Sequence, residues 1–348
     1  MATTPSNLIA TVESYLSPTL AIQPSTSNDP SAPAFHLLPL TTQAKLRNFG
    51  PIRVKDMRAL GHSKQIISHI PFPASALTCA KLNDALYAAN RLNADKFVPL
   101  ALLPSGAGEG KDAARELQKC ITKYRFVGGV LGLGPGSSRS GNLDDRSFDE
   151  LWALAEKYRV PVALREMWPI ESELSKTYQH NLPASVLAPL VSHIHAVLNS
   201  QTALYLLHLY LSSTFDRFPS LRLILCHPGV LPSQFRRITA FLALIPDADK
   251  PKRPFLDVWQ HNVYLTTADV QDMSSLRSLL ELIPVDRVLY ASNYPFEERG
   301  KELMEELRGS GFLTGRSGRG LLGECGGTVW IEGGDVGKAA GGVPGYLK

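Results

Sequence analysis

Short apolar runs alternate along this chain with longer stretches that have the apolar spacing of helices. Each run is long enough for one buried strand and too short for a helix. The predicted strands cover residues 8–11, 64–70, 96–104, 126–134, 160–166, 221–226, 262–268 and 286–297. The predicted helices cover residues 52–60, 75–92, 113–124, 148–158, 191–213, 232–244, 273–283 and 298–308. Eight such units within residues 1–308 indicate an α/β fold, a single closed (β/α)8 barrel.

Two stretches interrupt this alternation. Residues 17–50 are rich in Pro, Ser, Thr and Asn without sustained periodicity, which predicts a long irregular loop over a site after the first strand. From Gly309 onward, 14 of the 27 glycines fall within the last 40 residues. A glycine in a helix costs roughly 0.5–1 kcal/mol, so residues 309–348 are expected to form a disordered or loosely attached tail.

The strand predicted at residues 221–226 ends abruptly at His227-Pro228-Gly229. Proline has no backbone N–H, and glycine adopts backbone angles that other residues resist. The apolar run therefore delivers the imidazole of His227 to the C-terminal tip of a strand, where parallel α/β folds place their chemistry. His69 lies in the same way at the tip of the second strand. The alternative is a histidine that merely ends a strand.

Composition narrows the class of protein. The chain has 348 residues and 44% hydrophobic content, enough for a large core. The net charge of +4 is small and the basic residues are scattered, so nucleic-acid binding is not expected. The four cysteines show no CxxC and no regular spacing, which argues against a zinc knuckle or a disulfide framework. Without a leader pattern or a membrane-length apolar run, we expect a cytoplasmic protein with no membrane partner.

Several stretches carry a family resemblance: ITKYRFVGGVLG, TFDRFPSLRLILCHPG, NVYLTTA and DRVLYASNYPFE, with a weaker match in RVKDMRALGHSKQIIS. They resemble the amidohydrolase-related superfamily, in the branch of dihydroxybenzoate and related aromatic-acid decarboxylases. They follow in order across residues 8–308. The resemblance implies a metal-dependent barrel that removes carboxyl groups from hydroxylated aromatic acids, and a possible homodimer.

The chain departs from this family at the positions that the resemblance assigns to the metal. Val12 and Ser14 replace ligands of the first strand, Arg165 stands where the fifth strand ends in a histidine, and Asn293 replaces an aspartate. Val230 likewise replaces a glutamate after the sixth strand. A guanidinium stays protonated and repels a divalent ion, and valine cannot coordinate one. We therefore expect no metal and no other cofactor, with Glu13 as the only carboxylate near the site.

The remaining side chains predict a different chemistry. His227 would donate or accept a proton near neutral pH, and Arg165 would hold a carboxylate, phenolate or enolate. The other predicted site residues are polar side chains at the same strand ends, namely Asn293 as a third catalytic group and Ser14, His69 and Tyr294 as substrate contacts. In the alternative interpretation, Arg165 forms a structural ion pair with Glu13 or Glu166.

Three classes of function remain open for such a pocket. The first is a decarboxylase-like lyase that acts on a hydroxylated aromatic or polyketide-derived acid without a metal. The second is a metal-free cyclase or isomerase of specialised metabolism, and the third is a non-catalytic relative that binds a ligand or a partner. The two enzyme classes take a small-molecule substrate. Release of carbon dioxide, an isomeric product, or binding without turnover would distinguish them.

Overall fold

A computed structural model describes residues 8–22, 29–134, 142–178, 182–198, 200–228 and 231–297, together with residues 302, 305 and 306. Its strands are all parallel to their neighbours and lie in two sheets. The first contains β1 (Leu8–Tyr15), β2 (His62–His69) and β3 (Phe97–Pro99). The second contains β4 (Ala101–Leu103), β5 (Gly129–Leu133), β6 (Val162–Glu166), β7 (Leu223–Leu225), β8 (Val263–Thr266) and β9 (Val288–Leu289).

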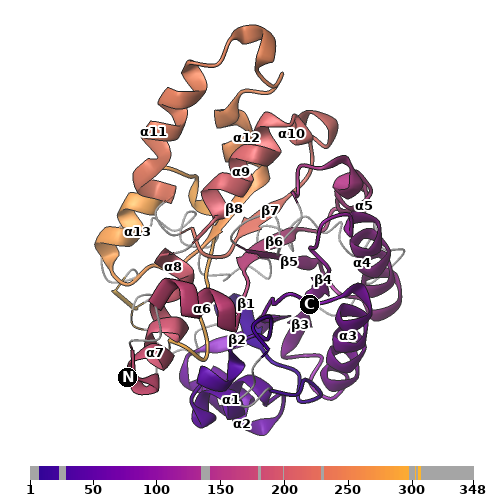
Figure 1. Cartoon of the computed structure of the whole chain (residues 1–348), viewed down its shortest axis with the longest axis vertical. Helices are drawn as coiled ribbons and strands as arrows, with labels where there is room; N and C mark the ends of the chain where they lie inside the picture. Colours follow the sequence, from indigo (N-terminus) through magenta and orange to yellow (C-terminus); the bar gives the residue numbers. More distant parts are fainter. Residues whose placement is uncertain are drawn as a thin grey trace.

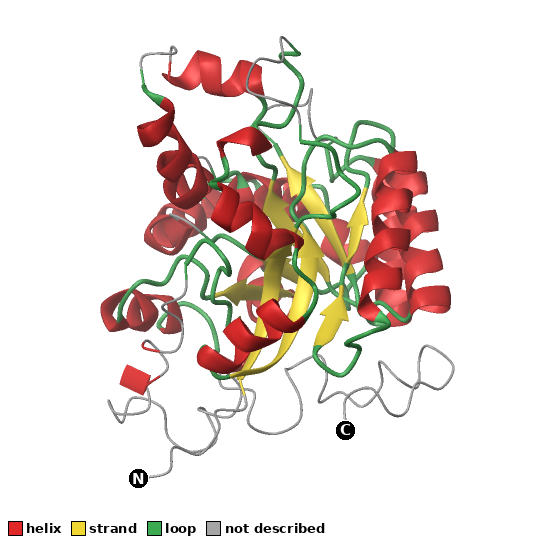
Figure 2. Cartoon of the chain, turned by 90° about the horizontal axis from the view of Figure 1, so that it is seen from below, coloured by secondary structure: helices red, strands yellow, loops and turns green. Residues whose placement is uncertain are grey.

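The two sheets join at both edges, which confirms the predicted eight-stranded barrel. Only Leu100 separates β3 from β4, so these two form the single strand predicted at residues 96–104. At the other edge the Thr11 amide donates to the Tyr290 carbonyl (2.8 Å) and the Ser14 amide donates to the Tyr294 carbonyl (3.2 Å). Figure 2 shows the strands side by side in the middle of the molecule, with helices outside them.

The helices return the chain between successive strands (Figure 1). They are α1 (Leu40–Arg47), α2 (Pro51–Ala59), α3 (Ala76–Asn90), α4 (Gly110–Tyr124), α5 (Asp149–Tyr158), α6 (Glu171–Tyr178), α7 (Ala184–Leu190), α8 (Ala196–Leu198), α9 (Thr202–Leu211), α10 (Thr214–Arg217), α11 (Leu231–Ala243), α12 (Phe255–Asn262) and α13 (Met273–Leu280). Ser75 caps α3 by accepting a hydrogen bond from the Thr78 amide. None of the described helices is long and apolar enough to cross a bilayer.

Two predicted segments differ from the structure. The segment 17–50 is not wholly irregular, because it contains a 3-10 turn (Phe35–Leu37) and α1, which buries Leu46. The helix predicted at 191–213 is broken into a π-helical turn (Val191–His195), α8 and α9. Ser200, between α8 and α9, makes tertiary hydrogen bonds that a pattern of apolar residues does not reveal. The predicted helix 298–308 lies mostly, and the tail 309–348 wholly, outside the described residues.

Strand alternation decides which side chains enter the barrel. On β6, Val162 and Leu164 pack in the core between the barrel and the helices, whereas Ala163 packs in the interior. The next residues continue this order. Arg165 shares the interior face with Ala163, and Glu166 shares the helix-facing side with Leu164. Arg165 and Glu166 are adjacent on β6, but one side chain lies in the barrel interior and the other faces the helices.

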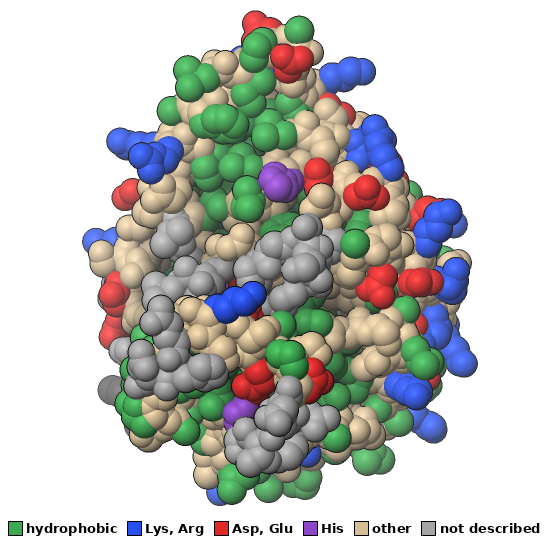
Figure 3. All heavy atoms as spheres, in the orientation of Figure 1, with side chains coloured by type: hydrophobic (Ala, Val, Ile, Leu, Met, Phe, Trp, Pro, Cys, Tyr) green, Lys and Arg blue, Asp and Glu red, His purple; other side chains and the backbone are tan. Residues whose placement is uncertain are grey.

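An apolar surface lies on the side of α9, α11 and α12 (Figure 3). The exposed apolar side chains of these helices include Leu204 of α9, Phe241 of α11 and Leu256 of α12. The homodimer predicted from the resemblance remains a prediction.

Candidate active site

The guanidinium of Arg165 lies at the C-terminal end of the barrel interior. Its Nη2 donates to Ser14 Oγ at 2.6 Å and its Nη1 reaches Ser68 Oγ at 3.4 Å. Arg165 is only 6% exposed, and both serines are fully buried. Residues that are 151 and 97 positions from Arg165 in the sequence therefore meet it in the fold.

Within the part of the chain that the structure describes, no carboxylate lies within ion-pair distance of Arg165. The alternative of a structural ion pair with Glu13 or Glu166 is therefore wrong. Burial lowers the pKa of Arg165, and the nearby carboxylates of Glu13 and Glu166 oppose that change. A buried cation is costly unless it is paired, so this position favours an anionic ligand.

His227 follows β7 and is held by a carboxylate that the sequence analysis missed. Its Nδ1 lies 2.7 Å from Oδ1 of Asp269, in the turn after β8; the His227 side chain is 8% exposed and that of Asp269 10%. Burial is the largest influence on the pKa of His227 and lowers it, but the Asp269 carboxylate and the Glu166 charge together raise it above its usual value. Asp269 comes directly after the predicted strand 262–268, and this position at a strand end could have identified it as a site residue from the sequence.

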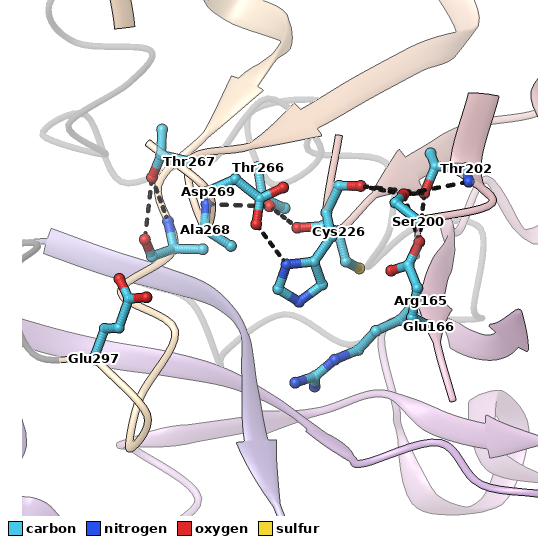
Figure 4. A network of polar contacts seen from close by, with 12 residues as sticks. Arg165, Glu166, Ser200, Thr202, Cys226, Thr266, Thr267, Ala268, Asp269 and Glu297 are labelled. Atoms are coloured by element: carbon cyan, nitrogen blue, oxygen red, sulfur yellow. Dashed lines mark hydrogen bonds and ion pairs between the residues drawn. The ribbon is translucent and has the colours of Figure 1, made fainter. Parts of the chain in front are cut away.

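Glu166, which the sequence analysis named only as an alternative partner of Arg165, is a second carboxylate near His227, so the expectation that Glu13 is the only carboxylate near the site is wrong. Its Oε1 accepts hydrogen bonds from Ser200 Oγ (2.7 Å) and Thr202 Oγ1 (2.9 Å). In Figure 4 the Glu166 carboxylate points toward these two hydroxyls while the Arg165 side chain extends the other way. Burial raises the pKa of Glu166, while the charge of His227 and these hydrogen bonds oppose the change.

Glu13 of β1 stabilises the fold where β1 meets β9 and closes the barrel. Its Oε1 accepts from the Ser292 amide (2.7 Å) and hydroxyl (2.9 Å), and its Oε2 accepts from the Tyr294 amide (2.6 Å). The register of β1 shifts between Ala10 and Glu13, and Val12 there has a φ of 58°, unusual for a β-branched residue. This bulge lets Ser14 face the interior while Glu13 clamps the loop after β9.

The structure gives His69 and Tyr294 partners inside the fold. His69 Nδ1 donates to the Ile70 carbonyl (2.8 Å) and its Nε2 accepts from the Ser17 amide (3.1 Å), while burial lowers its pKa to about 4. Tyr294 is fully buried, and its hydroxyl donates to Asp56 of α2 at 2.8 Å. Substrate contacts by these two residues stay predictions and do not enter the function proposed below.

Asn293 lies in the loop after β9 with a φ of 56°, in the left-handed region that asparagine tolerates. Its carbonyl accepts from the amides of Phe296 (2.9 Å) and Glu297 (3.2 Å). Its catalytic role also stays a prediction. Gly229 and Val230, which the sequence analysis singled out beside His227, lie outside the described residues.

Aromatic side chains from several loops pack together beyond the strand ends. Trp168, three residues after Arg165, stacks on Phe35 (centroids 5.6 Å apart) and on Phe296 (5.9 Å). Phe72 packs edge-on against Phe35 at 5.8 Å. Phe35, Phe72 and Trp168 are buried. Such a cluster excludes water, which strengthens electrostatic interactions beneath it.

These strand ends do not fit the metal that the resemblance implies. Among the described residues, no group of three or more His, Cys, Asp or Glu side chains is placed to hold an ion. Ser14 Oγ already accepts from a guanidinium, Glu13 is used by the loop after β9, and Val12 offers no donor atom. A divalent cation would also meet the fixed charge of Arg165.

Comparisons with known proteins agree with the barrel fold. The Amidohydrolase family pattern matches residues 72–309. The decarboxylase orsB of Emericella nidulans is 30% identical over 277 residues, covering 78% of this chain and 82% of that protein. The gamma-resorcylate decarboxylase of Rhizobium sp. is 30% identical over 275 residues, covering 73% of this chain and 79% of its own length.

A solved structure shares the fold. It is a dihydroxybenzoic acid decarboxylase from Polaromonas with bound manganese and the inhibitor 2-nitroresorcinol, with a TM-score of 0.72, 22% identity, and coverage of 96% of this chain and 97% of that one. The family match spans more than half of the chain, and the relatives are named as decarboxylases. The chain therefore belongs to the amidohydrolase family, in the branch whose members include carbon–carbon lyases of aromatic acids.

Proposed function

We propose that this protein is a decarboxylase of a hydroxylated aromatic or polyketide-derived carboxylic acid that works without a metal ion. Arg165 holds an anionic oxygen of the substrate, and His227 delivers the proton that replaces the carboxyl group. The named activities of the relatives support the reaction class. The observation that carries the proposal is the buried guanidinium of Arg165, which has no carboxylate partner among the described residues.

The immediate partners of Arg165 favour an anion. Because a guanidinium only donates, Ser14 Oγ and Ser68 Oγ act as acceptors toward Arg165. Each hydroxyl therefore keeps its own hydrogen to donate elsewhere. The guanidinium presents only donors and each hydroxyl can add one more, which suits a phenolate or carboxylate oxygen, and the guanidinium charge repels a cation.

The reaction balances with one proton from His227. The protonated imidazole gives its Nε2 proton to the ring carbon that bears the carboxylate, which turns an adjacent phenolate into a ketone. The bond to the carboxylate carbon then breaks, carbon dioxide leaves, and the electron pair returns through the ring to the oxygen as a phenolate. A cation that holds this oxygen stabilises the charge that develops there. A grip on the carboxylate would instead stabilise the ground state.

Asp269 fits this role for His227. Its carboxylate accepts from Nδ1, which orients the ring and leaves Nε2 as the nitrogen that can deliver a proton. The raised pKa of His227 keeps the imidazole protonated to higher pH than usual. A proton donor must be in its protonated form at the operating pH.

Incubation with a panel of hydroxybenzoates, with carbon dioxide measured in the presence and absence of a chelator, tests the proposal. We expect release that the chelator does not diminish and that His227→Ala abolishes. A product isomeric with its substrate would instead identify a cyclase or isomerase. Binding without turnover, with His227→Ala indistinguishable from wild type, would identify a non-catalytic relative. Stoichiometric manganese or zinc whose removal ends turnover would refute the metal-free mechanism.

A further inference from the structure

Burying the carboxylate of Glu166 is unfavourable for the stability of the fold. It is 8% exposed, and its Oε2 is buried without a hydrogen-bond partner among the described residues. A buried polar group left unsatisfied costs about 1–3 kcal/mol, and more when it is charged. An apolar side chain on the helix-facing side of β6 would serve the core better. Stability therefore does not explain why residue 166 is a glutamate.

The hydroxyls that bind Glu166 also bind the main chain of His227. Ser200 Oγ lies 3.0 Å and Thr202 Oγ1 lies 3.2 Å from the His227 carbonyl oxygen, and the two hydroxyls are 3.0 Å apart. Each hydroxyl has one hydrogen, and the two acceptors within reach are the Glu166 carboxylate and the His227 carbonyl. A substitution at Glu166 therefore changes which hydroxyl donates to the His227 carbonyl.

β7 ends at Leu225, two residues before His227, so the hydrogen bonds between strands do not extend to His227. The contacts with Ser200 and Thr202 hold its main chain instead. The preceding carbonyl, that of Cys226, accepts from Thr266 Oγ1 of β8, and the ring is held by Asp269. The His227 carbonyl itself depends on Ser200 and Thr202. Figure 4 shows this network, with Asp269 and Thr266 on one side and Ser200, Thr202 and Glu166 on the other.

We propose that Glu166 is a positioning residue for His227, acting through the paired hydroxyls of Ser200 and Thr202. This inference rests on the proposed function, in which His227 delivers the proton. Glu166 fixes the two hydroxyls, the hydroxyls fix the His227 peptide, and the peptide sets where the imidazole meets the substrate. An error of about 1 Å in such a placement can cost roughly 100-fold in rate.

Steady-state kinetics of four variants test this chain of contacts. Glu166→Ala is expected to lower kcat by about 10- to 100-fold with little change in KM, because the loss is in placing the proton donor and not in holding the substrate. Glu166→Gln keeps an acceptor oxygen and should recover most of the rate. The double variant Ser200→Ala/Thr202→Val should match Glu166→Ala, and combining all three changes should add nothing further.

Glu116 of α4 provides a matched control. It is also 8% exposed, and it is bound by Asn83 of α3 (2.8 Å) and Lys119 of α4 (2.9 Å), with no hydrogen bond to His227, Ser200 or Thr202 in the described part of the chain. Glu116→Ala should lower the melting temperature and leave kcat unchanged. A Glu166→Ala enzyme with wild-type kcat, or an effect that adds fully to that of Ser200→Ala/Thr202→Val, would overturn the inference.

A second measurement does not depend on turnover. The proton between His227 Nδ1 and Asp269 should give a downfield resonance in the NMR spectrum of the wild-type protein, and Glu166→Ala should shift or broaden it while Glu116→Ala leaves it unchanged. An unchanged resonance in Glu166→Ala would count against positioning. If no hydroxybenzoate is turned over, the proposed function fails, and this resonance still decides whether Glu166 positions His227.

Discussion

Replacing Arg165 with methionine should make the protein more stable and nearly inactive. Methionine has a similar length and flexibility, so it fills the same space in the barrel without a charge. Removing the guanidinium relieves the burial of a cation that has no carboxylate partner among the described residues. The same change removes the group that we propose holds the substrate anion.

The size of both effects follows from the contacts of Arg165. Burying an ion costs several kcal/mol, whereas a hydrogen bond to a charged group returns about 1.5–3 kcal/mol. Only the contact to Ser14, at 2.6 Å, is short, since the contact to Ser68 is 3.4 Å long. We therefore expect Arg165→Met to gain about 1–2 kcal/mol, a rise of about 2 °C or more in melting temperature. Losing a buried contact to an anion costs about 2–5 kcal/mol, or roughly 30- to several-thousand-fold in kcat/KM.

Arg53 provides the control, because it is also buried but makes two short hydrogen bonds, while its Nη2 has no hydrogen-bond partner among the described residues. It donates to Gln65 Oε1 and to the Ser14 carbonyl, both at 2.8 Å, and lies over the ring of Tyr294. Its removal leaves the Gln65 amide oxygen and the Ser14 carbonyl without their donor, at about 1–3 kcal/mol each, so Arg53→Met should lose about 2–6 kcal/mol. Thermal and urea unfolding of both variants, with carbon dioxide release from the best hydroxybenzoate, measure the contrast. If Arg165→Met is destabilised as much as Arg53→Met, or keeps wild-type kcat/KM, the reasoning about an unpaired cation is refuted.

Three further predictions concern protons and metal. Asp269→Asn removes the carboxylate that raises the pKa of His227, so the imidazole loses its proton at lower pH. The alkaline limb of the pH profile of kcat should therefore move to lower pH, and an unchanged limb would contradict this. His69 is buried with a pKa lowered from 6.5 to about 4, so it stabilises the fold above its unfolded pKa and loses that contribution, about 3 kcal/mol, as pH falls from 6.5 toward 4. Urea unfolding of His69→Gln should show a flatter acid limb, and parallel losses in both proteins would count against it. Dialysis against a chelator, followed by added manganese, should leave carbon dioxide release unchanged because the described strand ends do not offer three donor side chains, and restoration by manganese would show that they do bind it.

Local patterns in the sequence predicted the frame of this protein and the ends of its strands. Apolar runs of strand length and helical spacing between them are short-range properties, so the barrel and the position of His227 after β7 followed from them. The replacement of metal-binding residue types by Val12, Ser14, Arg165 and Asn293 was also visible in the residues themselves.

The tertiary structure decided which side chains meet at the barrel mouth. Asp269 reaches His227 from 42 residues away, and Ser14 reaches Arg165 from 151 residues away, so no local pattern joins them. The bulge at Val12 determines that Ser14 and not Glu13 faces the interior, because a shift of one residue in a strand turns every following side chain to the other face. Closure of the barrel likewise turns His69 and Tyr294 to partners within the fold. The identity of each residue is a property of the chain, but its surroundings depend on strand register, which long-range packing sets.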